Sequence, residues 1–192
     1  MDSSITPERH AYTGFTAPEK TTTIVIGTDD AKNVVNYYYT RNKYMLSWDL
    51  AGGEAENAYT YGTVYYEAPI VAPAPVKKGY SFHWDKTPES NMTDHNLSYT
   101  AKWTANQYNV FFERNGGTTE DGSDISAKTV TYAEAYGELP TLTKTGYTFD
   151  GWYTDAKEGE LVTDTAKVTR DQDHTLYAHF TPITYQIQYE NM

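Results

Sequence analysis

Residues 144–153 read KTGYTFDGWY, and residues 77–85 read KKGYSFHWD, a shorter version of the same pattern. Each stretch follows a strand-like segment that ends in a glycine pair: YMLSWDLAGG at 44–53 and YNVFFERNGG at 108–117. The same opening begins a third time at 185–192, YQIQYENM. Self-similarity of this kind indicates an array of repeated modules, so the unit to be explained is the module.

The repeats predict four parts of the chain. We expect the end of a different β domain at 1–43, repeat one at 44–103, repeat two at 108–180 and the first strand of a truncated third repeat at 184–192. Because that third repeat is cut short, we expect a longer parent protein. The four-residue linkers 104–107 and 181–184 leave little freedom, which predicts an elongated, semi-rigid array.

Alternating apolar residues predict a mainly β or α+β fold. In the first strand of repeat two, Tyr108, Val110 and Phe112 share one face by the period of two that a strand requires. Segment 133–139 (AEAYGEL) is the best helix candidate, limited to about two turns by the glycine and proline near its end. In the first part, 21–26 and 34–39 are predicted to form a hairpin.

Aromatic residues are the candidate core of both repeats. At 80, 82 and 84 the rings follow strict alternation, whereas in repeat two an extra Gly151 separates Phe149 from Trp152, as in a β-bulge. The competing interpretation is an exposed aromatic platform for sugar rings. The expected core residues are Trp48, Tyr80, Phe82, Trp84, Trp103, Phe112, Tyr147, Phe149, Gly151, Trp152 and Phe180.

Composition excludes several classes of partner. The net charge is -11 and no cluster of Lys and Arg is present, which argues against binding to nucleic acid or to an anionic membrane. The sequence has no cysteine, so it has no disulfide and no thiol nucleophile. No stretch reaches the eighteen or more apolar residues of a membrane span, so we expect no membrane insertion in this fragment.

The motifs of known active sites do not occur in the sequence. His95 and His174 each follow an aspartate in corresponding polar loops, which is more typical of a solvated turn than of a catalytic pair. Two acidic groups offer oxygen ligands for Ca²⁺ without the spacing of a dedicated loop, and a Lys–Asn isopeptide bond is a further alternative. We expect no enzyme activity, cofactor or metal; the acidic groups are Asp121 with Asp124, and Asp164 with Asp171 and Asp173.

Segment 108–180, with YNVFFERNGG, AEAYGELP, TKTGYTFDGWYTD and HTLYAHF, resembles the Listeria-Bacteroides repeat, which is also the B repeat of listerial internalins. Segment 44–103 is similar but lacks the glycine of the Gly-Trp pair. The stretch that ends in NVVNYYYTRNKY resembles the last strands of a mucin-binding-protein type domain. The resemblance implies tandem β-grasp-like modules in surface proteins of Gram-positive bacteria, with no known active site.

The expected function is therefore a non-enzymatic stalk or adhesion segment of an extracellular protein, attached to the cell wall through other parts of its parent. Its partners would be neighbouring repeats and, if it adheres, a host glycan or surface protein. One alternative is a module that binds glycan or host protein through exposed aromatics, and another is an accessory module of a hydrolase. We also expect the stub at 185–192 to be poorly packed or to lie against repeat two or another molecule.

Overall fold

The computed structural model describes residues 3–125 and 127–188. Within them the chain forms strands and one short 3-10 helix, and no α-helix, which confirms the prediction of a mainly β fold. Two compact units are present: one holds the chain up to Val76 together with 82–102, and the other holds 77–81 with the chain from Trp103 on. The elements are β1 (Ser3–Ile5), β2 (Phe15–Thr16), β3 (Ile24–Ile26), η1 (Asp30–Lys32), β4 (Thr40–Arg41), β5 (Lys43–Asp49), β6 (Glu54–Ala55), β7 (Gly62–Tyr65), β8 (Pro75–Val76), β9 (Tyr80–Trp84), β10 (Leu97–Ala105), β11 (Gln107–Glu113), β12 (Ala127–Thr131), β13 (Tyr147–Tyr153), β14 (Leu161–Val162) and β15 (His174–Pro182).

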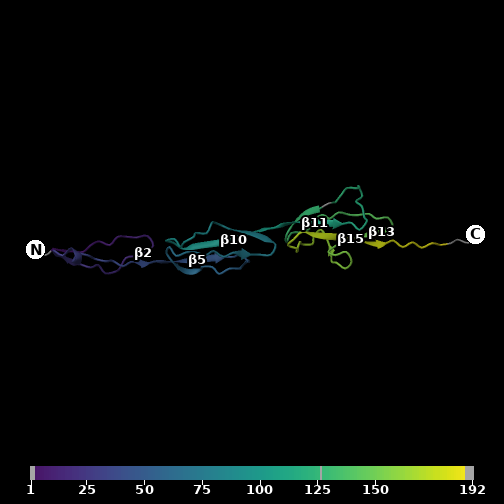
Figure 1. Ribbon diagram of the computed structural model, residues 1–192. Coiled ribbons are helices and arrows are strands. Elements are labelled where there is room, and N and C mark those ends of the chain that lie inside the picture. Colours follow the sequence, from purple (N-terminus) through teal and green to yellow (C-terminus); the bar gives the residue numbers. More distant parts are fainter. Residues whose placement is uncertain (1–2, 126, 189–192) are drawn as a thin grey trace, which may run out of the picture. The chain divides into compact units, whose positions relative to one another are not determined.

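The sheet of repeat two has five strands in the order β12-β11-β15-β13-β14. Its first and last strands, β11 and β15, are parallel neighbours at the centre, in register from Val110 opposite His174 to Glu113 opposite Tyr177 (Figure 1). The flanking pairs are antiparallel. Counted along the chain, the strands of this sheet therefore lie in the order second, first, fifth, third, fourth.

The register of β13 against β15 shifts between Phe149 and Gly151, at the place where the spacing predicts a bulge. Gly151 has φ 124°, a region that L side chains rarely adopt. After the shift Trp152 lies opposite Ala178 and joins the core face. The extra residue therefore returns the indole to the buried side of the strand.

The predicted helix at 133–139 is wrong. The backbone enters this segment through Ala133 at φ 63°, and Gly137 has φ 69°. Its amides bond across to another loop: Ala133 N–H to the Val168 carbonyl and Tyr136 N–H to the Ala166 carbonyl, both at 2.9 Å. Long-range hydrogen bonds thus satisfy the backbone groups that a helix would pair locally, and they leave the Tyr136 ring in the core.

Repeat one has a smaller version of the same sheet, ordered β7-β5-β10-β9, and a separate two-stranded pair of β6 and β8. Its first and last strands, β5 and β10, are again parallel, from Leu46 opposite Leu97 to Asp49 opposite Thr100. Figure 1 labels both strands, which run side by side. The repeats therefore share the central parallel pair and differ at the sheet edge.

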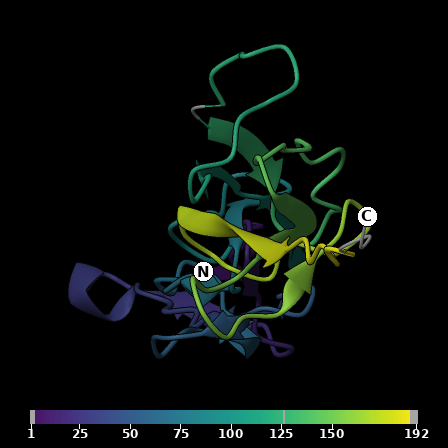
Figure 2. The same cartoon turned by 90° about the vertical axis from the view of Figure 1, so that its right-hand side faces the viewer.

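The first part of the chain forms two small antiparallel pairs, β1 with β3 and β2 with β4. The predicted hairpin is wrong, because 34–39 forms no strand and β3 pairs with β1. Hydrogen bonds of side chains hold this stretch instead: the Asn33 amide bonds both backbone groups of Gly27, and the Tyr37 and Tyr39 hydroxyls donate to the carbonyls of Pro7 and His10. Figure 2 shows the short coil of η1, in purple, beside this part of the chain.

Each repeat has its own hydrophobic core. The hydrophobic cluster of repeat two has ten buried residues: Val110, Phe112, Val130, Tyr136, Leu142, Trp152, Val162, Val168, Leu176 and Ala178. The hydrophobic cluster of repeat one has five buried residues, Leu46, Val64, Met92, Leu97 and Tyr99, with Trp48 and Trp84 partly buried against them. The modules therefore do not share one core.

Candidate functional site

Trp152 is the central ring of repeat two. It is 2% exposed, and its indole N–H donates to the Pro140 carbonyl at 2.7 Å. The rings of Phe112 and Phe149 pack edge-on against it, with centroids at 4.8 and 5.9 Å. A buried tryptophan whose indole N–H is hydrogen-bonded to a loop carbonyl is typical of a structural core residue. No face of this ring is free for a ligand.

Repeat one uses different rings for the same purpose. Here the indole that bonds a loop carbonyl is Trp48, whose N–H donates to Thr60 at 2.7 Å. Trp48 stacks on the fully buried Tyr99 with centroids 4.7 Å apart. Trp84, the expected equivalent of Trp152, is only half-buried beside Trp48. Sequence reasoning missed Tyr99, because alternation along the last strand gives it no mark that sets it apart from Trp103.

Phe82 and Tyr147 were expected in the core, and the structure places them at the surface, each 39% exposed. Phe82 contacts Trp84 edge-on, and Tyr147 lies under the Lys144 ammonium at 4.6 Å. Strict alternation put Phe82 on the face of Trp84, but β9 is the edge strand of a narrower sheet, so that face is not covered along its whole length. The other rings at the ends of β9, β10, β13 and β15 are half-buried: Tyr80, Trp103, Phe149 and Phe180.

A lysine covers the rings of each repeat at the same place. The Lys77 ammonium lies 4.9 Å from the Tyr80 ring and 5.7 Å from the Trp103 ring. In repeat two the Lys144 ammonium lies 5.0 Å from the Phe180 ring in addition to its contact with Tyr147. These cation–π contacts use the first residue of the two quoted motifs. They occupy the faces that a sugar-binding platform would present.

The two histidine loops have different structures despite their similar sequences. His95 and Asp94 form an exposed pair at 3.0 Å. His174 is 6% exposed and lies between the Tyr136 hydroxyl at 2.8 Å and the Gln172 carbonyl at 3.0 Å. Its neighbour Asp173 instead accepts the backbone N–H of Asn109 at 2.8 Å. His174 is therefore a satisfied core residue, and burial raises the pKa of its partner Tyr136.

Four of the five aspartates that could serve as calcium ligands have side chains bonded to other groups of the protein. Asp121 accepts the backbone N–H of Ser123 at 3.0 Å, which holds the pKa of this carboxyl below its usual value. Asp124 pairs with Arg114 and Asp171 pairs with Lys78. Over residues 3–125 and 127–188, no three His, Asp or Glu side chains converge where they could hold a metal ion.

The Lys–Asn hydrogen bond of repeat two does not place the two groups for an isopeptide bond. Lys144 donates to Asn115 at 2.8 Å, but the acceptor is the backbone carbonyl. The Asn115 side-chain amide donates to the Ala178 carbonyl at 2.7 Å. The amine and the amide carbon that would form the bond therefore belong to separate interactions.

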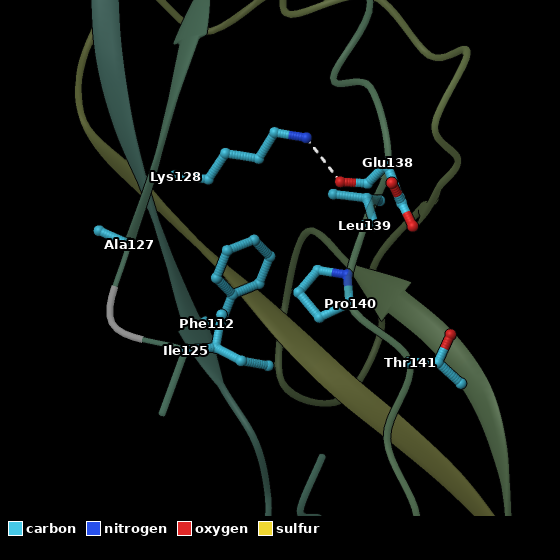
Figure 3. Close-up of a pocket in the computed structure, with 8 residues that line it drawn as sticks. All are labelled: Phe112, Ile125, Ala127, Lys128, Glu138, Leu139, Pro140 and Thr141. Atoms are coloured by element: carbon cyan, nitrogen blue, oxygen red, sulfur yellow. Dashed lines mark hydrogen bonds between the residues drawn. The ribbon is translucent and has the colours of Figure 1, made fainter. Parts of the chain in front are cut away.

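The surface of repeat two has a pocket of about 410 Å³ between β12 and the 138–141 segment (Figure 3). Polar and apolar groups share its wall. The Lys128 ammonium at its rim donates to the Glu138 carbonyl at 2.6 Å. The lining residues are Phe112, Ile125, Ala127, Lys128, Glu138, Leu139, Pro140 and Thr141. Because its one ammonium is already paired with the chain, the pocket presents little chemistry for selecting a ligand.

Two small, mainly β modules in tandem, each with its own core and with its first and last strands paired at the sheet centre, define a repeat protein. The family model of the Listeria-Bacteroides repeat domain matches residues 44–106 and 108–179. The chain belongs to this family. The expected boundaries 44–103 and 108–180 remain predictions, as does the mucin-binding-protein-like assignment of the first part.

The chain is also similar to longer curated proteins. It is 31% identical over 166 residues to a putative Gly-rich membrane protein of Evansella cellulosilytica, covering 78% of this chain and 18% of that protein. A putative membrane protein of the same organism is 30% identical, covering 78% and 23%. Internalin H of Listeria monocytogenes is 34% identical over 120 residues, covering 56% and 20%. The chain thus spans about a fifth of the length of these relatives. No helix in the described parts of this chain is long and apolar enough to cross a membrane.

Proposed function

We propose that the chain is a non-enzymatic spacer segment of a bacterial cell-surface protein, which holds other, binding domains at a distance from the cell. The observation that carries the proposal is the tandem arrangement of two family repeats, each with a closed core of its own. Relatives described as membrane proteins and as an internalin support a surface location.

The polar chemistry of the repeats supports a structural role. In the described parts of the chain, every buried side-chain nitrogen and oxygen has a hydrogen-bond partner. Complete hydrogen bonding of buried polar groups is what a purely structural core requires. The large rings of both cores likewise bond loop carbonyls or lie under lysines. We extend the proposal to attachment at the cell wall through other parts of the parent protein.

A second function, adhesion by the repeats themselves, is favoured by the exposed tyrosines of repeat one. Tyr61 is 71% exposed and contacts Tyr59 with centroids 5.5 Å apart. Two adjacent phenols at the surface are a minimal platform for a sugar or a protein loop. A host glycan or surface protein would be the partner.

One experiment separates the two functions. The purified chain is titrated against a panel of glycans and against intact host cells, beside a Tyr61→Ser variant. A spacer predicts no saturable binding by either protein. Saturable binding that the variant loses would replace the spacer proposal with adhesion. Antibodies against the chain should label intact cells of the organism that expresses it, and a signal that appears only after lysis would overturn the surface location.

A further inference from the structure

A turn of glycine followed by an aromatic residue occurs three times in the chain: Gly14-Phe15, Gly79-Tyr80 and Gly146-Tyr147. We call it the Gly–aromatic turn. The glycines have φ 76°, 76° and 79°, so all three adopt the same left-handed φ. In each copy the glycine carbonyl accepts a backbone N–H from further along the chain, at 2.8 Å from Asn42, 2.9 Å from Asn106 and 2.9 Å from Ile183.

In the first two copies a tyrosine ring lies on the glycine. A methyl group on Gly79 would overlap the ring of Tyr132, and one on Gly14 would overlap the ring of Tyr66. The same tyrosine meets the aromatic residue of the turn edge-on, Tyr132 with Tyr80 at 5.5 Å. The glycine is therefore required by contact with a ring as well as by its backbone angle.

The seated tyrosines occupy equivalent places in their repeats. Tyr66 directly follows β7, and Tyr132 directly follows β12, so each is the first residue after the second strand of its sheet. Each precedes a residue of positive φ, Glu67 at 61° and Ala133 at 63°. The ring that covers a turn thus comes from the repeat that follows that turn.

An asparagine joins the turn to the tyrosine in both copies. The Asn106 carbonyl accepts the Tyr132 N–H at 2.9 Å. Its side-chain amide donates to the Tyr108 hydroxyl at 3.2 Å, and its side-chain oxygen accepts from the Ser81 hydroxyl at 2.6 Å. Asn106 therefore bonds the turn that precedes it and the first strand that follows it.

Asn42 makes the corresponding bonds at the first copy. Its carbonyl accepts the Tyr66 N–H at 2.8 Å, its amide lies 3.4 Å from the Tyr44 hydroxyl, and its side-chain oxygen accepts from Thr16 at 2.5 Å. We call the turn, the asparagine and the tyrosine together the joint. The same joint thus occurs where the segment on its N-terminal side has a different strand arrangement from the repeats, with β1 paired to β3 and β2 to β4. Because the joint occurs twice, it depends on the turn and on the repeat that follows it.

The third copy has the same turn, but no ring of the described chain lies on its glycine. An added methyl group on Gly146 would meet no atom of the described chain within 4 Å. Tyr147 is 39% exposed, and Tyr185, which corresponds to Tyr108, is 78% exposed. The Ile183 N–H already bonds the Gly146 carbonyl, and Lys144 already lies over Tyr147 as Lys77 lies over Tyr80.

We infer that the Gly146-Tyr147 turn is a docking site for a further repeat of this family. The tyrosine that directly follows the second strand of that repeat would pack its ring on Gly146. The inference rests on the proposed function as a repeat segment. The occupant follows from the two covered copies, because a phenol ring packs on the glycine and its own N–H bonds the carbonyl of the linker residue. At the third copy that carbonyl belongs to Ile183.

The test lengthens the chain by one repeat. Residues 1–184 are followed by a second copy of residues 108–182, which offers a second Tyr132 to the turn at Gly146. A ring seated on a glycine shifts the α-protons of that glycine upfield in the NMR spectrum. The Gly79 protons should be shifted in both proteins, and the Gly146 protons should be shifted only in the lengthened chain.

Glycine-to-alanine substitutions give a matched control, since the turns have the same φ. Gly146→Ala in the natural chain meets only the cost of a left-handed backbone, a change in the unfolding constant of about tenfold. The same substitution in the lengthened chain also displaces a ring, so we expect a further loss of about tenfold or more, as for Gly79→Ala. Replacing only the appended Tyr132 by alanine should remove both the NMR shift and the extra loss.

A folded appended repeat that leaves the Gly146 protons unshifted would overturn the inference. An extension with residues 44–106 presents Tyr66 in place of Tyr132 and is assessed in the same way, so the result does not depend on one appended repeat. An upfield shift in the natural chain that grows with concentration would also overturn it, because a second copy would then be the occupant. Either failure leaves the spacer role untouched, since binding and surface location are measured separately.

Discussion

Repeat one and repeat two place the same strands at the centre of their sheets and fill them with different side chains. In repeat two the anchored indole is Trp152 on the third strand, which packs against Phe112 within the core cluster. In repeat one the anchored indole is Trp48 on the first strand, and it stacks on Tyr99. The large ring has changed strand, while the hydrogen bond from an indole to a loop carbonyl is retained.

The backbone is more constant than the side chains. Ala51 and Asn115 have φ 48° and 49°, and each precedes a glycine with φ 81°. Positive φ is costly for a residue with a β-carbon, so its occurrence at equivalent places marks a turn that the fold requires. The comparison shows that turn geometry defines this repeat and that core volume is distributed within it in more than one way.

The largest expected effect is the loss of Trp152. Trp152→Ala should cost about 3 to 5 kcal/mol, because a fully buried ring and its hydrogen bond are removed, and this is comparable to the stability of a small domain. Amide exchange along β11 and β15 measures the loss in repeat two alone. The equivalent change Trp84→Ala should cost about half as much, since Trp84 is half-buried. Equal losses of stability in Trp152→Ala and Trp84→Ala would contradict the difference between the two repeats.

A second prediction tests which tryptophan anchors repeat one. Trp48→Phe removes the bond to the Thr60 carbonyl and part of the stack on Tyr99, which should cost about 1.5 to 3 kcal/mol. Trp84→Phe removes neither and serves as the control. Urea unfolding of both variants gives the comparison. A greater loss for Trp84→Phe would mean that the two repeats use the same tryptophan after all.

A third prediction concerns the buried hydrogen bond between Tyr136 and His174, a pair that repeat one lacks. Tyr136→Phe leaves the His174 ring nitrogen buried without its partner, at a cost of about 1 to 2 kcal/mol. Tyr147→Phe, at an exposed phenol, should cost little. Burial raises the pKa of Tyr136 above the usual tyrosine value of 10.0. The stability that this side chain contributes is therefore fully present below that pH and is lost as the pH rises through the folded pKa. Unfolding followed from pH 8 to 11 should show a smaller alkaline slope in Tyr136→Phe than in the natural chain.

The smallest effect is expected at the C-terminal stretch. Tyr185 and Ile187 are 78% and 76% exposed, and β15 ends before them at Pro182. Deleting 183–192 should therefore change the stability of repeat two by less than about 0.5 kcal/mol, although it removes the bond from Ile183 to Gly146. A larger loss, measured by thermal unfolding, would show that the stretch belongs to repeat two. Residues 189–192 of the expected first strand of a third repeat lie outside the described part of the chain.

The sequence predicts the strands and their repetition well, because alternation and glycine turns are local signals. The shift at Gly151 is predictable for the same reason. The helix at 133–139 fails because its amides bond to a loop that is distant in sequence. The exchange of roles between Trp84 and Trp48 also depends on a distant residue, since Tyr99 occupies the core beside them. Periodicity identifies a face of a strand, but it does not identify which ring on that face is covered.

The parallel pair at the centre of each sheet has a mechanical consequence. The chain enters repeat two through β11 and leaves it through β15, and these parallel neighbours place the entry and the exit at opposite ends of the pair. A pull on the two ends therefore draws the strands along their axes in opposite directions. Shear of this kind loads the hydrogen bonds of the ladder together, whereas a hairpin pulled at its open end loses them one at a time. Since β5 and β10 repeat the arrangement, each repeat should resist tension along the chain by the strength of a whole ladder.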